Sequence, residues 1–122
     1  MAEVKILDHG GQRVLLVDLS SVNTGQGIVE TAEEAIRIVQ STNQQRSVRG
    51  LIDLSGTSLN KDVRGTLKKM SQSNGPYMKA VAFVGLGVIL SLVIKGFLVV
   101  SGRSNHRVFS TRRDALDWLA RN

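Results

Sequence analysis

The fold of this chain is decided by one long apolar stretch, Lys79-Ala-Val-Ala-Phe-Val-Gly-Leu-Gly-Val-Ile-Leu-Ser-Leu-Val-Ile-Lys-Gly-Phe-Leu-Val-Val-Ser101. Residues 80–84 are apolar, as in a buried strand, and Gly85 and Gly87 follow them. We predict a turn at these glycines and then an apolar helix over residues 88–100. A strand that leads through a turn into a helix is half of a βαβ unit, so this stretch predicts a parallel sheet.

The same stretch raises the alternative of a membrane span, because roughly 20 apolar residues are enough to cross a bilayer. Between residues 80 and 102 the only charged residue is Lys95. The two glycines, however, divide the stretch into a strand-length and a helix-length piece. Residues 103–122 then continue with a short strand and a helix, so we predict no membrane span.

The composition is that of one globular domain that comprises residues 1–122. Aromatic residues make up only 4% of the chain, so the core must be built from aliphatic side chains. Cysteine is absent, which excludes disulfides, thiolate metal sites and a cysteine nucleophile. The N-terminus begins Met-Ala-Glu-Val-Lys and lacks the apolar run of a signal peptide, so we expect a cytoplasmic protein.

The rest of the chain supplies the other elements of an α/β sheet. Gly10 and Gly11 separate two β-rich runs, residues 4–8 and 13–19, and predict an antiparallel hairpin. Residues 51–54 form a second apolar strand, and a helix over residues 60–73 ends at Asn74-Gly75-Pro76.

Two capping boxes place two further helices. Thr31-Ala-Glu-Glu34 predicts a helix over residues 31–42, and Thr111-Arg-Arg-Asp114 predicts a final helix after a short strand at residues 107–109. The complete order is ββαβαβαβα. It predicts a mostly parallel five-stranded sheet with one antiparallel N-terminal strand and four helices on its faces.

Two short phrases carry a family resemblance, Leu51-Ile-Asp-Leu-Ser-Gly-Thr-Ser-Leu59 and Val108-Phe-Ser-Thr-Arg-Arg-Asp-Ala-Leu-Asp-Trp-Leu119. The first resembles the strand and turn of STAS domains, the superfamily of bacterial anti-sigma-factor antagonists. The second is similar to the end of an uncharacterised STAS-like branch, which has been compared with the CRAL-TRIO lipid-carrier fold. The resemblance implies a STAS-like fold over nearly the whole chain and a module that works through a regulatory protein partner.

The sequence departs from this family at its regulatory site. In the antagonists an Asp-Ser-Ser/Thr-Gly phrase follows the turn, and its second hydroxyl is phosphorylated at a helix N-terminus. This chain reads Leu59-Asn-Lys-Asp-Val-Arg-Gly65 there, without a serine or threonine. The substitutes that we consider for a regulatory turn are Ser55, Thr57, Ser58 and Asp62. Turn hydroxyls more commonly cap backbone amides.

Asp18 and Asp53 both end predicted parallel strands, at the edge where open α/β sheets bind ligands. Two carboxylates there can hold a magnesium ion or act as acid and base, or each can simply bond to loop amides. Gly85 and Gly87 complete this candidate ligand edge, although they lack the third glycine and the lysine of nucleotide-binding loops. We expect no cofactor and no metal.

The formal net charge of +6 makes anionic partners plausible. Lys61, Arg64 and Lys68 recur at three- and four-residue spacing and therefore share one helix face. This basic face suits an acidic protein or phosphates, or is simply solvated. The chain contains no recognisable nucleic-acid-binding module, so we expect no nucleic-acid partner.

The predicted helix over residues 88–100 is apolar nearly all round and cannot be buried by its own sheet alone. Part of it should be covered by a second subunit or by lipid. The candidate interface residues are Ile89, Leu92, Val93, Gly96, Phe97 and Val100. A symmetric homodimer is our first expectation, and a pocket for an apolar ligand is the second.

Three functional hypotheses follow from the sequence. The first is a non-catalytic STAS-like regulatory or protein-interaction module that forms a homodimer. The alternative is a carrier or sensor of an apolar small molecule or lipid. The third is an enzyme that uses Asp18 and Asp53.

Overall fold

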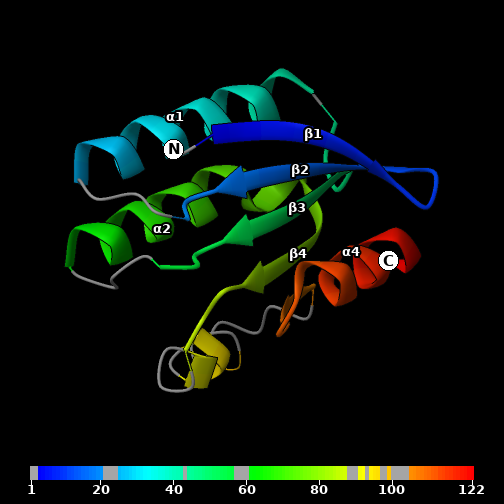
Figure 1. The fold of residues 1–122 in the computed structure, drawn as a ribbon. Coiled ribbons are helices and arrows are strands. Elements are labelled where there is room, and N and C mark those ends of the chain that lie inside the picture. Colours follow the sequence, from blue (N-terminus) through cyan, green and yellow to red (C-terminus); the bar gives the residue numbers. More distant parts are fainter. Residues whose placement is uncertain are drawn as a thin grey trace.

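A computed structural model describes residues 3–20, 25–42, 44–56, 61–87, 91–92, 94–96, 99 and 105–122. They form a five-stranded sheet with strand order β1-β2-β3-β4-β5 and helices on both faces (Figure 1). Strands β1 and β2 pair antiparallel, and all other neighbours pair parallel, which confirms the predicted fold class. The elements are β1 (Glu3–His9), β2 (Gln12–Asp18), α1 (Gly25–Ser41), β3 (Val48–Asp53), α2 (Lys61–Asn74), the 3₁₀ helix η1 (Gly75–Tyr77), β4 (Met78–Val84), β5 (His106–Val108) and α4 (Arg112–Arg121).

The turn between β1 and β2 has the geometry that its two glycines predict. Gly10 and Gly11 have φ angles of 56° and 78°, in the left-handed region that other residues adopt only at a cost. A two-residue turn of this kind matches the twist of antiparallel strands. The predicted hairpin is confirmed.

The sequential strand order decides which face each helix covers. Crossovers between parallel strands are right-handed, so α1 and α2, which both connect to the next strand in the same direction, lie on one face. Helix α4 follows the last strand and lies on the other face (Figure 1). Strand β2 alternates accordingly. Leu15 and Val17 belong to the core under α1 and α2, while Val14 and Leu16 belong to the core under α4.

The predicted start of the first helix was wrong. Helix α1 begins at Gly25, so Thr31 lies inside the helix and is buried, and its hydroxyl donates to the carbonyl of Gly27 at 2.8 Å. The apolar face starts earlier than the capping box suggested, because Ile28 is also buried. The second capping signal is correct, since the Thr111 hydroxyl accepts a hydrogen bond from the Asp114 amide at 3.1 Å.

The predicted helix after Gly87 is described only in part. Residues 91, 92, 94–96 and 99 have helical backbone, and the Ser91 amide donates to the Gly87 carbonyl at 2.8 Å. Of the candidate interface residues, Leu92 and Gly96 are exposed, while the side chains of Ile89, Val93, Phe97 and Val100 lie outside the described residues. Within the described part of the chain, no helix combines the length and apolar character needed to cross a membrane.

Candidate functional site

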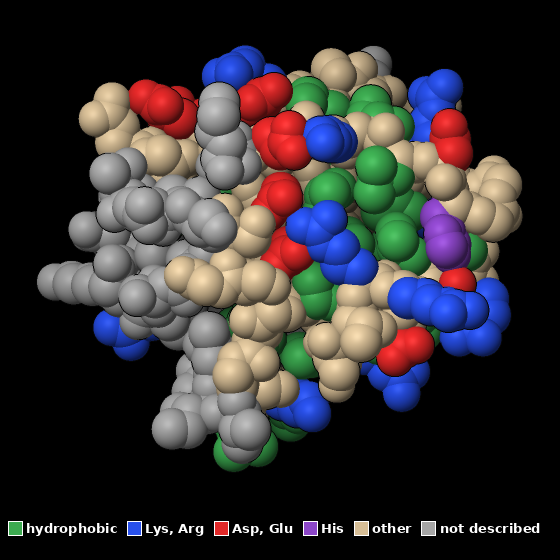
Figure 2. Space-filling model, in the orientation of Figure 1, with side chains coloured by type: hydrophobic (Ala, Val, Ile, Leu, Met, Phe, Trp, Pro, Cys, Tyr) green, Lys and Arg blue, Asp and Glu red, His purple; other side chains and the backbone are tan. Residues whose placement is uncertain are grey.

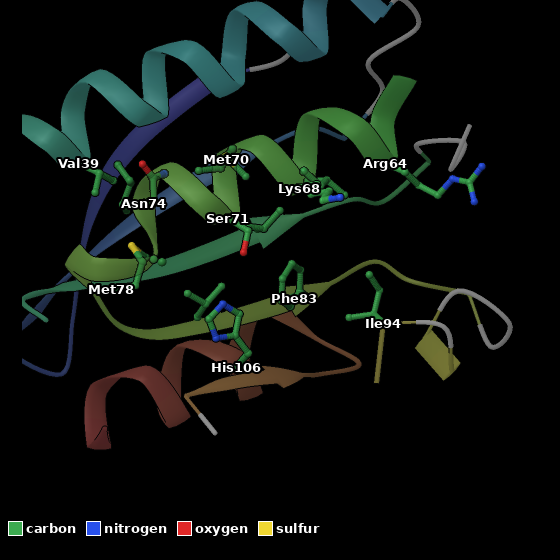
Figure 3. A pocket seen from close by; sticks show the side chains of 17 residues that line it. Val39, Arg64, Lys68, Met70, Ser71, Asn74, Met78, Phe83, Ile94 and His106 are labelled. Carbon is green, nitrogen blue, oxygen red and sulfur yellow. The ribbon is translucent and has the colours of Figure 1, made fainter. Parts of the chain in front are cut away.

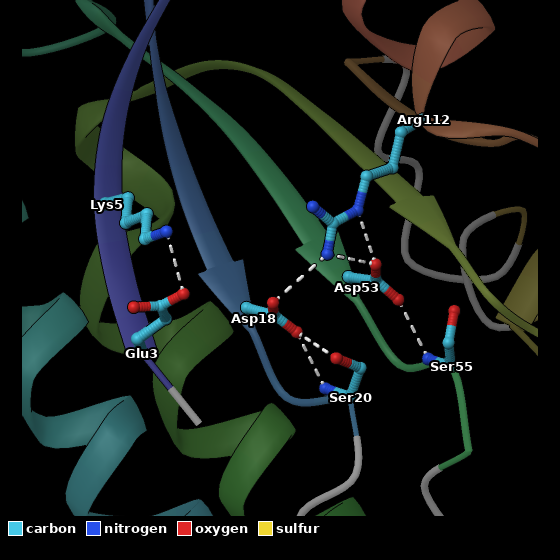
Figure 4. A network of polar contacts seen from close by, with 7 residues as sticks. All are labelled: Glu3, Lys5, Asp18, Ser20, Asp53, Ser55 and Arg112. Atoms are coloured by element: carbon cyan, nitrogen blue, oxygen red, sulfur yellow. Dashed lines mark hydrogen bonds and ion pairs between the residues drawn. The ribbon is translucent and has the colours of Figure 1, made fainter. Parts of the chain in front are cut away.

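Asp18 and Asp53 end adjacent strands and face each other across the parallel pair of β2 and β3. A third residue, Arg112 at the start of α4, joins them (Figure 4). Its Nε donates to Asp53 Oδ2 at 2.6 Å, and its Nη2 donates to Asp18 Oδ2 at 3.1 Å. We call these three residues the carboxylate clasp. Arg112 was not among the site residues predicted from the sequence, although a helix that follows a parallel strand must begin at this same edge.

The remaining carboxylate oxygens of the clasp bind the turns that follow the strands. Asp18 Oδ1 accepts from the backbone amide of Ser20 at 2.9 Å and from its hydroxyl. Asp53 Oδ1 accepts from the Ser55 amide at 2.9 Å. All four oxygens therefore have a partner, which agrees with the expectation that each aspartate bonds to loop amides. Among the residues that the structure describes, no three His, Cys, Asp or Glu side chains cluster as metal ligands would.

The electrostatics of the clasp favour its charged form. Partial burial raises the pKa of Asp18, but the hydrogen bonds from Ser20 and the guanidinium of Arg112 together outweigh burial, so the pKa lies below its ordinary value. Burial likewise lowers the pKa of Arg112, and its bonds to Asp53 and Asp18 more than reverse this effect. The Asp53 side chain is only 5% exposed, and its Oδ2 lies 2.6 Å from Arg112 Nη2.

The glycines of the candidate ligand edge do not share one role. Gly85 has a φ angle of +81°, and a Cβ there would lie 2.3 Å from the backbone nitrogen of Ser55. The turn after β4 therefore packs directly on the turn after β3, and only glycine fits. Gly87 is exposed, and a Cβ there would meet no described atom within 4 Å. This geometry corresponds to a close backbone contact rather than to a loop that surrounds phosphate.

The proposed regulatory turn is described only at its first residue. Ser55 is exposed beside Gly85. Thr57 and Ser58 lie outside the described residues, and for Asp62 only the helical backbone is described. The regulatory role of this turn stays a prediction.

A cavity of about 280 Å³ lies on the face of the sheet opposite to α4 and the carboxylate clasp, between α2 and the strands β3 and β4 (Figure 3). We call it the α2 cavity. Its walls are mostly apolar and include Ile52, Leu67, Met70, Met78, Val81 and Phe83. Sequence reasoning missed this space, although it had predicted that an apolar ligand pocket would lie near the apolar helix. Ile94 of that helical segment does line the cavity.

Two residues of the basic face also line the α2 cavity. Arg64 and Lys68 are exposed and lie on the side of α2 nearest the cavity, while the side chain of Lys61 lies outside the described residues. On the face of the molecule seen in Figure 2, acidic and basic side chains are interspersed. The net charge of +6 is therefore not gathered into a single basic patch on that face.

Solved structures with the same arrangement identify the fold. An uncharacterised protein of the DUF3478 family with a SpoIIAA-like fold, from Shewanella loihica, superposes with a TM-score of 0.67 at 19% identity, covering 98% of this chain and 95% of that one. The chain has a STAS-like fold. An anti-sigma-factor antagonist (STAS) domain protein from Planctomyces limnophilus superposes with a TM-score of 0.60 at 15% identity, covering 98% and 99% of the two chains. No protein-family model matches the sequence, and no curated protein matches it significantly.

Proposed function

We propose that this chain is a non-catalytic STAS-like module that holds an apolar or amphipathic small molecule, as a carrier or a sensor, in the α2 cavity. The observation that carries the proposal is the size of this apolar space, about 280 Å³. Small-molecule sites in proteins are typically concave, mostly apolar spaces with a few polar groups. An apolar cavity of roughly 150 Å³ already binds benzene, so this one has room for a larger ligand.

The carboxylate clasp supports a function without catalysis. All four oxygens of Asp18 and Asp53 are bonded to Arg112 or to the serine turns. Arg112 bridges one oxygen of each carboxylate and so occupies the place between them that a shared metal ion would take. The clasp accordingly serves to hold α4 on the sheet.

Replacing Ser71 by leucine tests the proposed ligand site. Ser71 is part-buried and lines the α2 cavity, so a leucine there would occupy part of the space. We expect the wild-type chain to bind 1-aminonaphthalene, whose fluorescence emission shifts to shorter wavelength in apolar surroundings, and Ser71→Leu to bind it at least tenfold more weakly. Gln72→Leu adds the same side chain to the exposed neighbouring position and should bind the dye as wild type does. Equal binding by both variants, or no binding by wild type, would overturn the proposal.

A protein-interaction module that forms a homodimer is the second candidate function. The observation in its favour is the exposure of Leu92 (65%) and Val99 (81%) on the helical segment after β4. A second copy or a regulatory protein in the cytoplasm would cover these side chains. Native mass spectrometry separates the two functions. A monomer that retains a small molecule supports the carrier, whereas a ligand-free dimer that Leu92→Lys dissociates supports the interaction module.

A further inference from the structure

Helix α2 contributes two kinds of side chain to the wall of the α2 cavity. Leu67 and Met70 are apolar, and they are part-buried and buried. Arg64, Lys68 and Ser71 also line the cavity, and their spacing of four and three residues places them on one side of the helix, toward β4 (Figure 3). Because Arg64 and Lys68 are exposed and Ser71 is part-buried, this side of α2 forms a rim between the apolar space and solvent.

The full charges along this rim have one sign. Among the described residues that line the cavity, Arg64 and Lys68 are cations and none is acidic. Neither of them takes part in the ion pairs that the described residues form with one another. Like charges four residues apart on a helix repel each other, so the two cations do not stabilise α2. The rim therefore offers two positive charges to an anionic group.

We propose that the ligand of the α2 cavity is an amphiphile whose anionic head group, a carboxylate or a phosphate monoester, pairs with Arg64 and Lys68 while its apolar tail occupies the cavity. This inference rests on the proposed function, because it names the ligand class for the same cavity. Scaled from the cavity that holds benzene, the space admits a tail of roughly a dozen non-hydrogen atoms. The tail lies against side chains of the sheet such as Val81 and Phe83.

The head group belongs at the rim because a charge that enters an apolar space loses its hydration. Long basic side chains keep their charged ends in water while their aliphatic stems cover apolar surface, which suits the exposed positions of Arg64 and Lys68. A guanidinium donates two parallel hydrogen bonds to a carboxylate or a phosphate, and an ammonium binds either one as a point charge. A neutral or cationic head group would leave both charges of the rim unused.

Two probes of the same size test the charge of the head group. Octanoate is an anion at neutral pH, and octanamide is its neutral counterpart with the same number of non-hydrogen atoms. Each is titrated as a competitor of 1-aminonaphthalene against wild type, Lys68→Gln and the double variant Arg64→Gln/Lys68→Gln. We expect the ratio of octanoate affinity to octanamide affinity to fall about threefold in Lys68→Gln and about tenfold in the double variant, as exposed charge pairs imply.

Lys69→Gln is the matched control, because Lys69 is exposed on α2 and is not among the residues that line the cavity. It removes the same charge from the same helix and should leave the affinity ratio unchanged. The dye is neutral at this pH, so every variant should bind it as wild type does, which shows that the cavity is intact. Octyl phosphate, titrated in the same way, distinguishes the two head groups, since the preferred anion loses more affinity in the double variant.

A measurement on wild type alone does not depend on the folding of any variant. Added salt screens exposed charges, so it should lower the ratio of octanoate affinity to octanamide affinity. If the probes displace the dye but the affinity of neither anion relative to octanamide changes in the double variant, or if it falls equally in Lys69→Gln, the inference is overturned while the proposed function stands. If neither the dye nor any probe binds the wild-type chain, the proposed function fails and the inference fails with it.

Discussion

The edge of the sheet at the carboxylate clasp and the α2 cavity satisfy their polar groups in opposite ways. At the edge, every carboxylate oxygen of Asp18 and Asp53 has a partner, and Gly85 lets two turns touch. Around the α2 cavity, mostly apolar walls border about 280 Å³, and the buried Oδ1 of Asn74, one of the lining residues, has no partner among the described residues. Both regions belong to one sheet, but they lie on different faces of it.

This difference is why we assign a structural role to the clasp and propose a ligand for the cavity. The general rule for open α/β sheets favours ligand binding at the carboxyl ends of the strands. Here each carboxylate oxygen of Asp18 and Asp53 already has a partner within the chain. The cavity instead has room, and the flexible side chains of Met70 and Met78 line it and can adapt to a guest.

The largest expected difference in stability is between two glycine-to-alanine variants, one at the edge of the sheet and one beside the α2 cavity. Gly85→Ala places a Cβ 2.3 Å from the Ser55 backbone and forces a positive φ on alanine, so we expect a loss of about 3 kcal/mol or more in unfolding free energy. Gly50→Ala places its Cβ 2.6 Å from the Cε of Met78, which can turn into the α2 cavity. We expect this variant to lose less than about 1 kcal/mol.

Urea denaturation of both glycine variants at neutral pH measures this contrast. A Gly50→Ala loss as large as that of Gly85→Ala would mean that the cavity is as rigid as the edge. The contrast between the two regions would then be wrong.

Arg112→Ala removes the cation of the carboxylate clasp and leaves the buried charge of Asp53 without its partner. Breaking a fully buried pair costs roughly 3–5 kcal/mol. Because the Arg112 side chain is 42% exposed and solvent screens it, we expect about 2 kcal/mol from urea denaturation. Arg113→Ala, at the exposed neighbouring position, should change stability by less than about 0.5 kcal/mol. Equal losses of unfolding free energy in Arg112→Ala and Arg113→Ala would show that the clasp does not stabilise the fold.

A smaller effect is expected from pH. The pKa of Asp18 is lower in the folded chain than in the unfolded chain, so its stabilisation is complete above the ordinary carboxyl pKa, about 3.9. That stabilisation is lost as the pH falls through the folded value. We therefore expect Asp18→Asn to be less stable than wild type near pH 6, by less than about 1 kcal/mol, and to lose less stability upon acidification to pH 3.

Thermal unfolding between pH 3 and pH 6 measures this difference. Asp8→Asn removes an exposed carboxylate on β1, outside the clasp, and serves as the control. If the unfolding temperatures of wild type and Asp18→Asn change with pH in parallel, ionised Asp18 does not stabilise the fold as proposed. Ligand binding at the α2 cavity should be unchanged in Asp18→Asn, because the clasp lies on the other face.

Local signals in the sequence predicted the fold well. The glycine pair at residues 10 and 11, the apolar strands and the stop at Asn74-Gly75-Pro76 each act over a few residues, and each gave the correct element. Thr31 misled, because a threonine inside a helix and a threonine at its start look alike when the upstream turn is not recognised as helical. The pairing of Asp18 with Asp53 was also predictable, since both end parallel strands.

The sequence by itself determined the succession of strands and helices along the chain, because periodicity, glycine turns and capping residues are properties of neighbouring residues. Only the tertiary structure decided that Arg112 joins two aspartates that lie 94 and 59 residues earlier in the chain. It alone also decided that α2 leaves a cavity over β4. Both depend on how distant elements pack against one sheet, and no local pattern encodes the space that remains between them.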